Sequence, residues 1–184
     1  NQVENKPTFG QNIQMDESRR MLVISGPNAG GKSITLKTLG LFQLMVQSGM
    51  FISANENNTF CLFSQIYSEI GDNQSIENEL STYSYRLTRM KKFLSLSNSE
   101  TLLLLDEFGT GSDPDLGGAL AEAFFESLYR KKIFAILTTH YSNIKSRAIQ
   151  LPQAINGCML FNPINLQPLF RFEMGSPGSS FTFE

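Results

Sequence analysis

The fold of this chain is decided by the stretch MLVISGPNAGGKSITLKTLG, residues 21–40. An apolar run at residues 21–25 leads into a turn that contains glycine and proline. Apolar residues then recur with helical spacing over residues 33–46. This order predicts a strand, a loop and a helix.

The turn GPNAGGKS, residues 26–33 and hereafter the glycine-rich loop, fits the pattern G-x-x-x-x-G-K-[ST]. Its glycines let successive backbone N–H groups face an anion, and the helix that follows adds partial positive charge. We expect Lys32 to reach the terminal phosphates of a nucleotide and Ser33 to offer its hydroxyl to Mg²⁺. A glycine-rich turn without a ligand is the alternative. The candidate nucleotide contacts are Gly26, Pro27, Asn28, Ala29, Gly30, Gly31, Lys32, Ser33 and Ile34.

An acidic pair follows a second apolar run, TLLLLDE at residues 101–107. Four consecutive leucines predict a strand buried on both faces, as in a parallel sheet covered by helices. At its end we expect Asp106 to hold Mg²⁺ and Glu107 to orient and deprotonate the attacking water. The alternative is a solvated strand terminus, and only the glycine-rich loop upstream makes the pair a strong signal.

A third apolar run, IFAILTTH at residues 133–140, ends on His140, the only histidine of the chain. A lone histidine after such a run is commonly structural. Ligands of open α/β sheets bind at the carboxyl ends of the strands, however. We therefore expect His140 to bond the γ-phosphate or the attacking water, as a switch or positioning group.

The rest of the chain completes an α/β pattern. One or two strands are expected within residues 52–70, and a helix capped by Ser81 and Thr82 is expected to end near residue 97. A further helix is predicted over residues 116–130 and a hairpin over 154–174. The predicted fold is a mainly parallel sheet flanked by helices, with an antiparallel hairpin at its edge.

Composition excludes several protein classes. Of 184 residues 41% are apolar, and the near balance of 15 basic and 17 acidic residues gives no excess of positive charge for binding nucleic acid.

Cys61 and Cys158 lack a metal-ligand spacing and are expected to be buried, reduced thiols. No apolar stretch is long enough to cross a bilayer, so we expect a cytoplasmic protein. We expect one domain over residues 1–184, cut from a longer protein.

Two nucleotide-binding classes fit the sequence poorly. A small GTPase would carry the guanine-specifying tetrapeptide N/T-K-x-D, which is absent from the sequence. A nucleoside kinase would carry an arginine-bearing lid, whereas most arginines here lie on predicted helices or at termini.

Four segments together carry a family resemblance: GPNAGGKS, GDNQSIENELSTYS, DEFGTGSDP and TTHY. With them the chain resembles the ATPase domain of the MutS family from about Thr8 to Glu184. It is closest to the second bacterial branch, whose members lack a mismatch-recognition domain and often end in an Smr nuclease domain. Where the mismatch-repair branch usually reads GRGTST, this chain reads GTGSDP, which argues against a direct role in mismatch correction.

The resemblance implies a P-loop NTPase of ABC-ATPase type that pairs head to tail as a homodimer. Ser81 and Thr82 would then be a signature that contacts the γ-phosphate held by the partner, rather than a simple helix cap. Residues 109–114 would cross the dimer axis, with Asp113 near the partner's site; an ordinary turn is the alternative.

Three other positions are assigned through the same resemblance. Asn28 would approach the γ-phosphate, and Gln74 would sense metal and water. Phe9, or a neighbour, would stack on adenine; a core phenylalanine is an equal alternative.

The expected function is ATP binding and hydrolysis that drives dimer closure in a protein that clamps nucleic acid. The clamped object would be recombining DNA or RNA in a stalled ribosome, held by domains outside this chain, where any nuclease activity would also lie. The alternative is a dimerising ATP sensor with negligible turnover.

Overall fold

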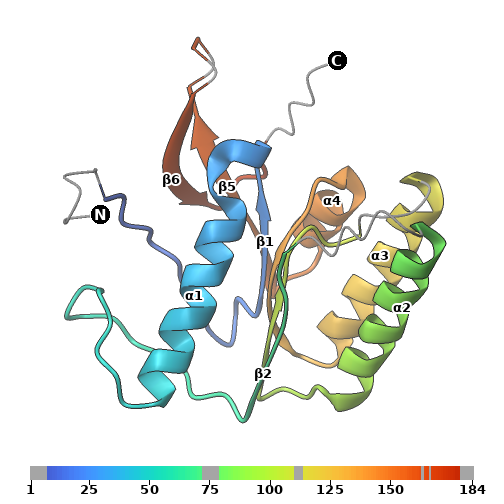
Figure 1. Ribbon diagram of the computed structural model, residues 1–184, viewed down its shortest axis with the longest axis horizontal. Helices are drawn as coiled ribbons and strands as arrows, with labels where there is room; N and C mark the ends of the chain where they lie inside the picture. The colour runs from blue at the N-terminus through green and yellow to red at the C-terminus, as the bar shows by residue number, and fades with distance from the viewer. Residues whose placement is uncertain (1–7, 72–78, 110–113, 163, 166, 179–184) are drawn as a thin grey trace.

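The computed structural model describes residues 8–71, 79–109, 114–162, 164–165 and 167–178, and for residues 28, 79–83 and 114–116 the backbone alone. The described elements alternate between strand and helix along most of the chain (Figure 1). In chain order they are β1 Met21–Ser25, the 3-10 turn η2 Asn28–Gly30, α1 Lys32–Gln47, β2 Gln65–Glu69, α2 Glu79–Leu96, β3 Thr101–Leu105, α3 Pro114–Arg130, β4 Phe134–Thr138, α4 Ser142–Gln150, β5 Ala154–Phe161 and β6 Pro168–Met174.

The six strands form one sheet in the order β2-β3-β4-β1-β5-β6. The first five strands run parallel, and β6 pairs antiparallel with β5 at the edge. The α/β fold with a mainly parallel sheet and an antiparallel edge pair is therefore confirmed.

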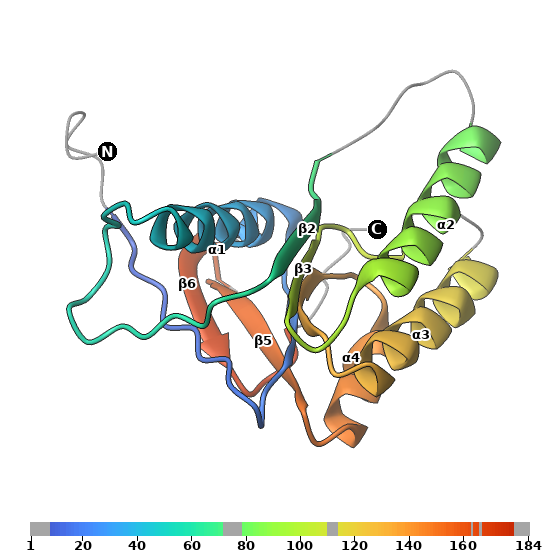
Figure 2. The ribbon, with the colours of Figure 1, turned by 90° about the horizontal axis from the view of Figure 1, so that it is seen from below.

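Helices cover both faces of the sheet. Figure 2 shows α1 on one side and α2, α3 and α4 on the other. Alternate residues of β1 separate into the two cores, with Val23 facing the three-helix side and Ile24 the α1 side. The central strands β1, β3 and β4 are buried along their whole length, as expected for strands that are covered on both faces.

The neighbouring strands β1 and β4 lead into helices on opposite faces, α1 and α4. Connections that diverge in this way leave a crevice at the carboxyl ends of the two strands, where open α/β sheets bind ligands. The glycine-rich loop follows β1 and His140 follows β4, so both lie at this crevice.

One strand, β2, lies within residues 52–70, in agreement with the expectation of one or two strands there. Other sequence-based expectations need correction. Helix α2 begins at Glu79, so Ser81 and Thr82 lie inside its first turn and do not precede it as caps. Strand β4 ends at Thr138, two residues before His140. Helix α4 was not anticipated from the sequence.

The two cysteines are free, as expected, but they differ in environment. Cys158 is buried in β5, whereas Cys61 is exposed, which contradicts the expectation that both are buried. Within the described part of the chain, no helix is both long and apolar enough to span a bilayer.

Candidate nucleotide site

The glycine-rich loop turns sharply between β1 and α1. Gly26 and Gly31 adopt φ angles of 127° and 96°, in a region that side chains disfavour. Gly31 precedes α1, and because glycine has no side chain it cannot cap the first amides of that helix. These amides, with the positive end of the helix dipole, remain directed toward the crevice and suit an anion.

Lys32 is buried at the start of α1 and folds back over the loop. Its ammonium donates hydrogen bonds to the carbonyl oxygens of Gly26 at 2.8 Å and Pro27 at 3.0 Å. Burial lowers the pKa of Lys32, and the carboxylates of Glu107 and Asp106 act in the opposite direction. The ammonium thus lies between the loop and the acidic pair, where an anionic ligand would gain most from its charge.

Ser33 and Asp106 come together across the crevice. Ser33 Oγ donates a hydrogen bond to Asp106 Oδ1 at 3.0 Å, and Thr138 Oγ1 donates to the same oxygen at 2.7 Å. Ser33 comes from α1 and Asp106 directly follows β3, so the contact joins segments far apart in the sequence. Hydroxyl and carboxylate oxygens are the donors that Mg²⁺ prefers.

Glu107 follows in an unusual backbone conformation. Its φ angle is 48°, in the left-handed region that residues other than glycine seldom adopt. Its N–H donates to Thr138 Oγ1 at 2.8 Å. The two successive acids therefore differ in backbone geometry, and two different roles are physically reasonable for them.

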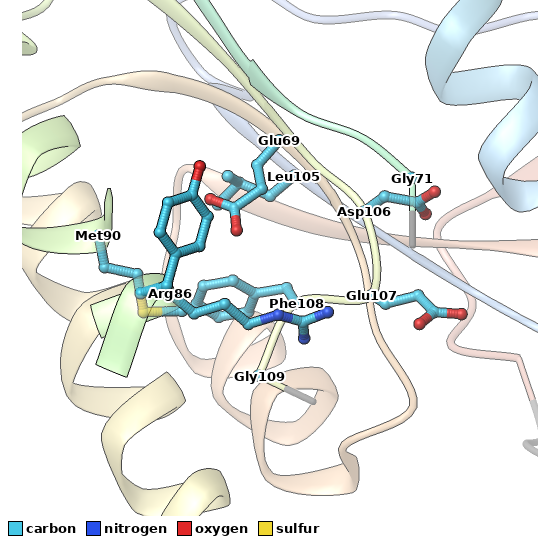
Figure 3. Close-up of a pocket in the computed structure, with 10 residues that line it drawn as sticks. Glu69, Gly71, Arg86, Met90, Leu105, Asp106, Glu107, Phe108 and Gly109 are labelled. Carbon is cyan, nitrogen blue, oxygen red and sulfur yellow. The ribbon is translucent and has the colours of Figure 1, made fainter. Parts of the chain in front are cut away.

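A groove runs from the acidic pair toward α2, and Figure 3 shows Arg86 extending along it past Phe108 in the direction of Glu107. Burial raises the pKa of Glu69 at the groove wall, while Arg89 and Arg86 lower it. Arg89 Nε lies 3.8 Å from Glu69 Oε2. The two arginines of α2 thus place positive charge next to Glu69, and Arg86 lines the same groove as the acidic pair, which was not anticipated from the sequence. The groove is lined by Glu69, Gly71, Tyr85, Arg86, Met90, Leu105, Asp106, Glu107, Phe108 and Gly109.

His140 is half-buried at the same crevice. Burial lowers its pKa, and the positive charges of Lys32 and Lys145 lower it further. Lys32 and Lys145 thus act electrostatically on His140, and its expected bond to the γ-phosphate or the attacking water stays a prediction. The neutral imidazole is favoured in this environment, and it can both donate and accept a hydrogen bond.

The chain after β6 returns to the glycine-rich loop, which was not foreseen. Gly178 N donates to Ser25 Oγ at 2.7 Å, and Lys145 Nζ donates to the Gly178 carbonyl at 3.3 Å. A Cβ atom added to Gly178 would lie 3.2 Å from the Gly26 nitrogen. Residues far apart in the sequence thus support the start of the loop.

Phe9 is not a core residue, because 42% of its surface is exposed. It lies 5.8 Å from Phe170, between ring centres, and lines a pocket of about 400 Å³. The Gln11 side chain bonds both Phe170 O and Phe172 N, which attaches this segment to β6. The pocket is formed by Thr8, Phe9, Gly10, Asn12, Arg171 and Phe172.

Several candidate positions cannot be placed. Gln74 and Asp113 lie outside the described residues. For Asn28, Ser81 and Thr82 only the backbone is described, so their proposed phosphate contacts stay predictions. The side chain of Ile34 is 67% exposed and lies on the outer surface of α1.

Comparison with known proteins supports a specific family. Residues 22–178 match MutS domain V. The chain belongs to the MutS family. Its resemblance to the second bacterial branch is also confirmed, because its relatives include proteins named Endonuclease MutS2.

Identity to these MutS2 relatives extends over nearly the whole chain. It is 46% over 172 residues with the protein from Halothermothrix orenii, covering 94% of this chain and 22% of the relative. The identity is 43% over 182 residues with the protein from Pediococcus pentosaceus, and this match covers 99% of this chain and 23% of the relative. This MutS-family chain therefore spans less than a quarter of the length of those relatives.

Proposed function

We propose that this chain is a Mg²⁺-dependent ATPase with the P-loop architecture of ABC-type ATPases, and that residues 1–184 form one ATPase domain. The observation that carries the proposal is the 3.0 Å hydrogen bond between Ser33 Oγ and Asp106 Oδ1. It brings two oxygen donors together beside the glycine-rich loop, at the topological crevice of the sheet. Family membership supports the same activity, since MutS proteins are ATPases.

The side chains present fit the proposed ligands. Ser33 and Asp106 would hold Mg²⁺, whose charge would offset that of the phosphates. The loop amides and Lys32 would bind the phosphate oxygens. Glu107 would accept a proton from the attacking water, and His140 would orient that water or the γ-phosphate.

The base of the nucleotide requires an aromatic or apolar surface. We propose that adenine lies against Phe9, because this ring is exposed in a pocket next to β6. Stacking on an exposed aromatic ring favours any purine, so the pocket would add affinity more than selectivity.

We propose that two copies of the chain share their nucleotides, with Ser81 and Thr82 of one copy reaching the γ-phosphate of the other. Both residues lie in the first turn of α2, whose amides can bind an anion. Closure of the pair would tighten the grip of the longer protein on nucleic acid, either recombining DNA or RNA in a stalled ribosome. A cytoplasmic location belongs to the same proposal.

Mixing two damaged chains tests the shared site. A Ser81→Ala chain and a Lys32→Ala chain can form a mixed dimer in which one site is damaged twice and the other is intact. Phosphate release should therefore be higher in the mixture than in either variant alone. Release that equals the average of the two variants would refute the exchange of Ser81 between copies.

A further inference from the structure

Thr138 is the last residue of β4 and is fully buried. Its neighbours are the three residues that directly follow β3, namely Asp106, Glu107 and Phe108. No catalytic or ligand-binding role falls to Thr138 in the ATPase described above. Its contacts nevertheless reach both members of the acidic pair.

The Thr138 hydroxyl links the two acids. It donates its single proton to Asp106 Oδ1 at 2.7 Å and accepts the Glu107 N–H at 2.8 Å. A threonine hydroxyl has one proton to donate and lone pairs to accept with, so both bonds form together. The side chain of one acid and the backbone of the next are thereby connected through one buried oxygen.

The Thr138 backbone adds a third bond to the same turn. Phe108 N donates to the Thr138 carbonyl at 2.7 Å, so the amides on both sides of the Glu107 α-carbon are tied to Thr138. Such bonding explains how Glu107 keeps a φ angle of 48°. Unusual backbone conformations persist where their surroundings over-determine them, and they gather at functional sites.

Asp106 receives a second hydroxyl on the same oxygen, from Ser33 at 3.0 Å. Two buried or half-buried hydroxyls from α1 and β4 thus converge on Oδ1 and restrict the rotation of the carboxylate. Without the Thr138 hydroxyl, Asp106 Oδ1 would keep one of these two hydroxyl donors, that of Ser33. It would also take away the acceptor of the Glu107 amide.

We propose that Thr138 is a positioning residue that holds the Asp106 carboxylate and the Glu107 backbone in one fixed arrangement. This role rests on the proposed ATPase function, in which Asp106 holds the metal ion and Glu107 serves as the base. In this role Thr138 acts through the two acids and needs no contact of its own with substrate or metal. It acts by holding the Asp106 carboxylate and the Glu107 backbone in a fixed position relative to each other.

Valine is the informative substitution, because Thr138→Val keeps the branched shape and the backbone carbonyl but removes the hydroxyl. Thr138→Ser restores a hydroxyl. Thr101→Val is the matched control, since Thr101 is also fully buried and hydrogen-bonded but begins β3 at the opposite edge of the sheet. Thr138→Ala replaces the valine variant if that variant does not fold.

The first readout is hydrogen exchange of the Glu107 amide, followed by NMR on the ¹⁵N-labelled chain without nucleotide. Exchange should become at least about tenfold faster in Thr138→Val and stay within about threefold of the original rate in Thr138→Ser and Thr101→Val. Unchanged exchange in Thr138→Val would overturn the proposal. This readout does not depend on turnover.

The second readout separates positioning from a loss of stability. In Thr138→Val, kcat for Mg·ATP should fall about tenfold while ATP affinity changes less than about threefold, because outer contacts of a metal ligand have effects of this size. Thr138→Ser should recover most of the rate. An equal loss in Thr101→Val would overturn the positioning role. A complete lack of turnover in the unmodified chain would instead refute the ATPase function, and amide exchange would still decide the role of Thr138.

Discussion

Ser33 Oγ and Asp106 Oδ1 lie 3.0 Å apart although 73 positions separate the two residues in the sequence. The contact exists because β1 and β3 are parallel strands whose carboxyl ends reach the same edge of the sheet. It places a helix-borne hydroxyl against a strand-end carboxylate. Under the proposed function, Ser33 and Asp106 would hold a magnesium ion, whose charge would offset that of the phosphates.

Ser33→Ala and Asp106→Asn should each weaken magnesium binding at this site. We expect the Mg²⁺ concentration that gives half-maximal phosphate release to rise at least about tenfold, since each variant removes or neutralises an oxygen donor. The measurement is a Mg²⁺ titration at fixed ATP. Thr38→Ala is the control, because that hydroxyl is exposed on the same helix and donates to Ile34 O within the helix itself. An identical Mg²⁺ requirement in all three variants would remove the proposed metal site.

Glu107→Gln distinguishes an enzyme from a sensor. If Glu107 is the base, kcat should fall by about 10² or more while ATP still binds, and ATP-bound dimers should accumulate in size-exclusion chromatography. Glu100→Gln, an exposed residue just before β3, should behave like the unmodified chain. A sensor predicts release that is negligible before and after the change.

His140 offers a direct measurement of the electrostatics of the site, since it is the only histidine and its ring signals are unambiguous. Its NMR titration midpoint should lie below 6.5, because burial and the charges of Lys32 and Lys145 lower its pKa. Lys145→Met should move the midpoint upward, whereas Lys37→Met, on the exposed surface of α1, should not.

The same shift predicts the direction of a stability change with pH. A histidine whose pKa is lowered by folding contributes stability that is complete above its unfolded pKa, near 6.5. That contribution is lost as the pH falls through the folded pKa. His140→Gln should therefore reduce the acid dependence of the urea midpoint below pH 6.5; an unchanged dependence would show that His140 is not perturbed.

Gly109→Ala tests the turn that follows the acidic pair. Gly109 has a φ angle of 92°, and an added Cβ atom would lie 2.8 Å from Tyr141 Cε2. Backbone strain and overpacking together should cost about 2–4 kcal/mol in the free energy of unfolding, measured with urea.

The control for this change is Gly118→Ala within α3. There the added Cβ atom would make ordinary contacts, the nearest at 3.5 Å from Tyr141 Cδ1. Alanine should be neutral or stabilise the helix by up to about 1 kcal/mol. Equal effects at the two glycines would show that the turn at Gly109 is not strained.

The sequence allowed the central sheet to be predicted because its strands are continuous apolar runs, which are typical of parallel strands covered by helices on both faces. Strands β1, β3 and β4 and helix α1 could be recognised from such runs and from helical spacing. Helix α4 was missed because it is short and mostly polar: it has nine residues, and its two buried ones, Ile144 and Ala148, lie one helical turn apart but are too few to mark a helix in the sequence.

The candidate site was predictable in its motifs but not in its supports. The glycine-rich loop and the acidic pair have recognisable spacing, whereas Thr138 looks like an ordinary β-branched strand residue. Its role depends on where its hydroxyl points, which only the three-dimensional arrangement reveals. The contact between Gly178 and Ser25 joins distant positions that have no local signal.

The central claim is that the glycine-rich loop binds the triphosphate of ATP beside the acidic pair. Isothermal titration calorimetry of Mg·ATP into the chain, with Lys32→Ala as the comparison, tests it most directly, and circular dichroism verifies that both proteins are folded. The account predicts saturable binding to the original chain and none to Lys32→Ala, because that lysine is the only cation within the loop. Absence of binding to the folded original chain, or equal affinity in both proteins, would contradict it.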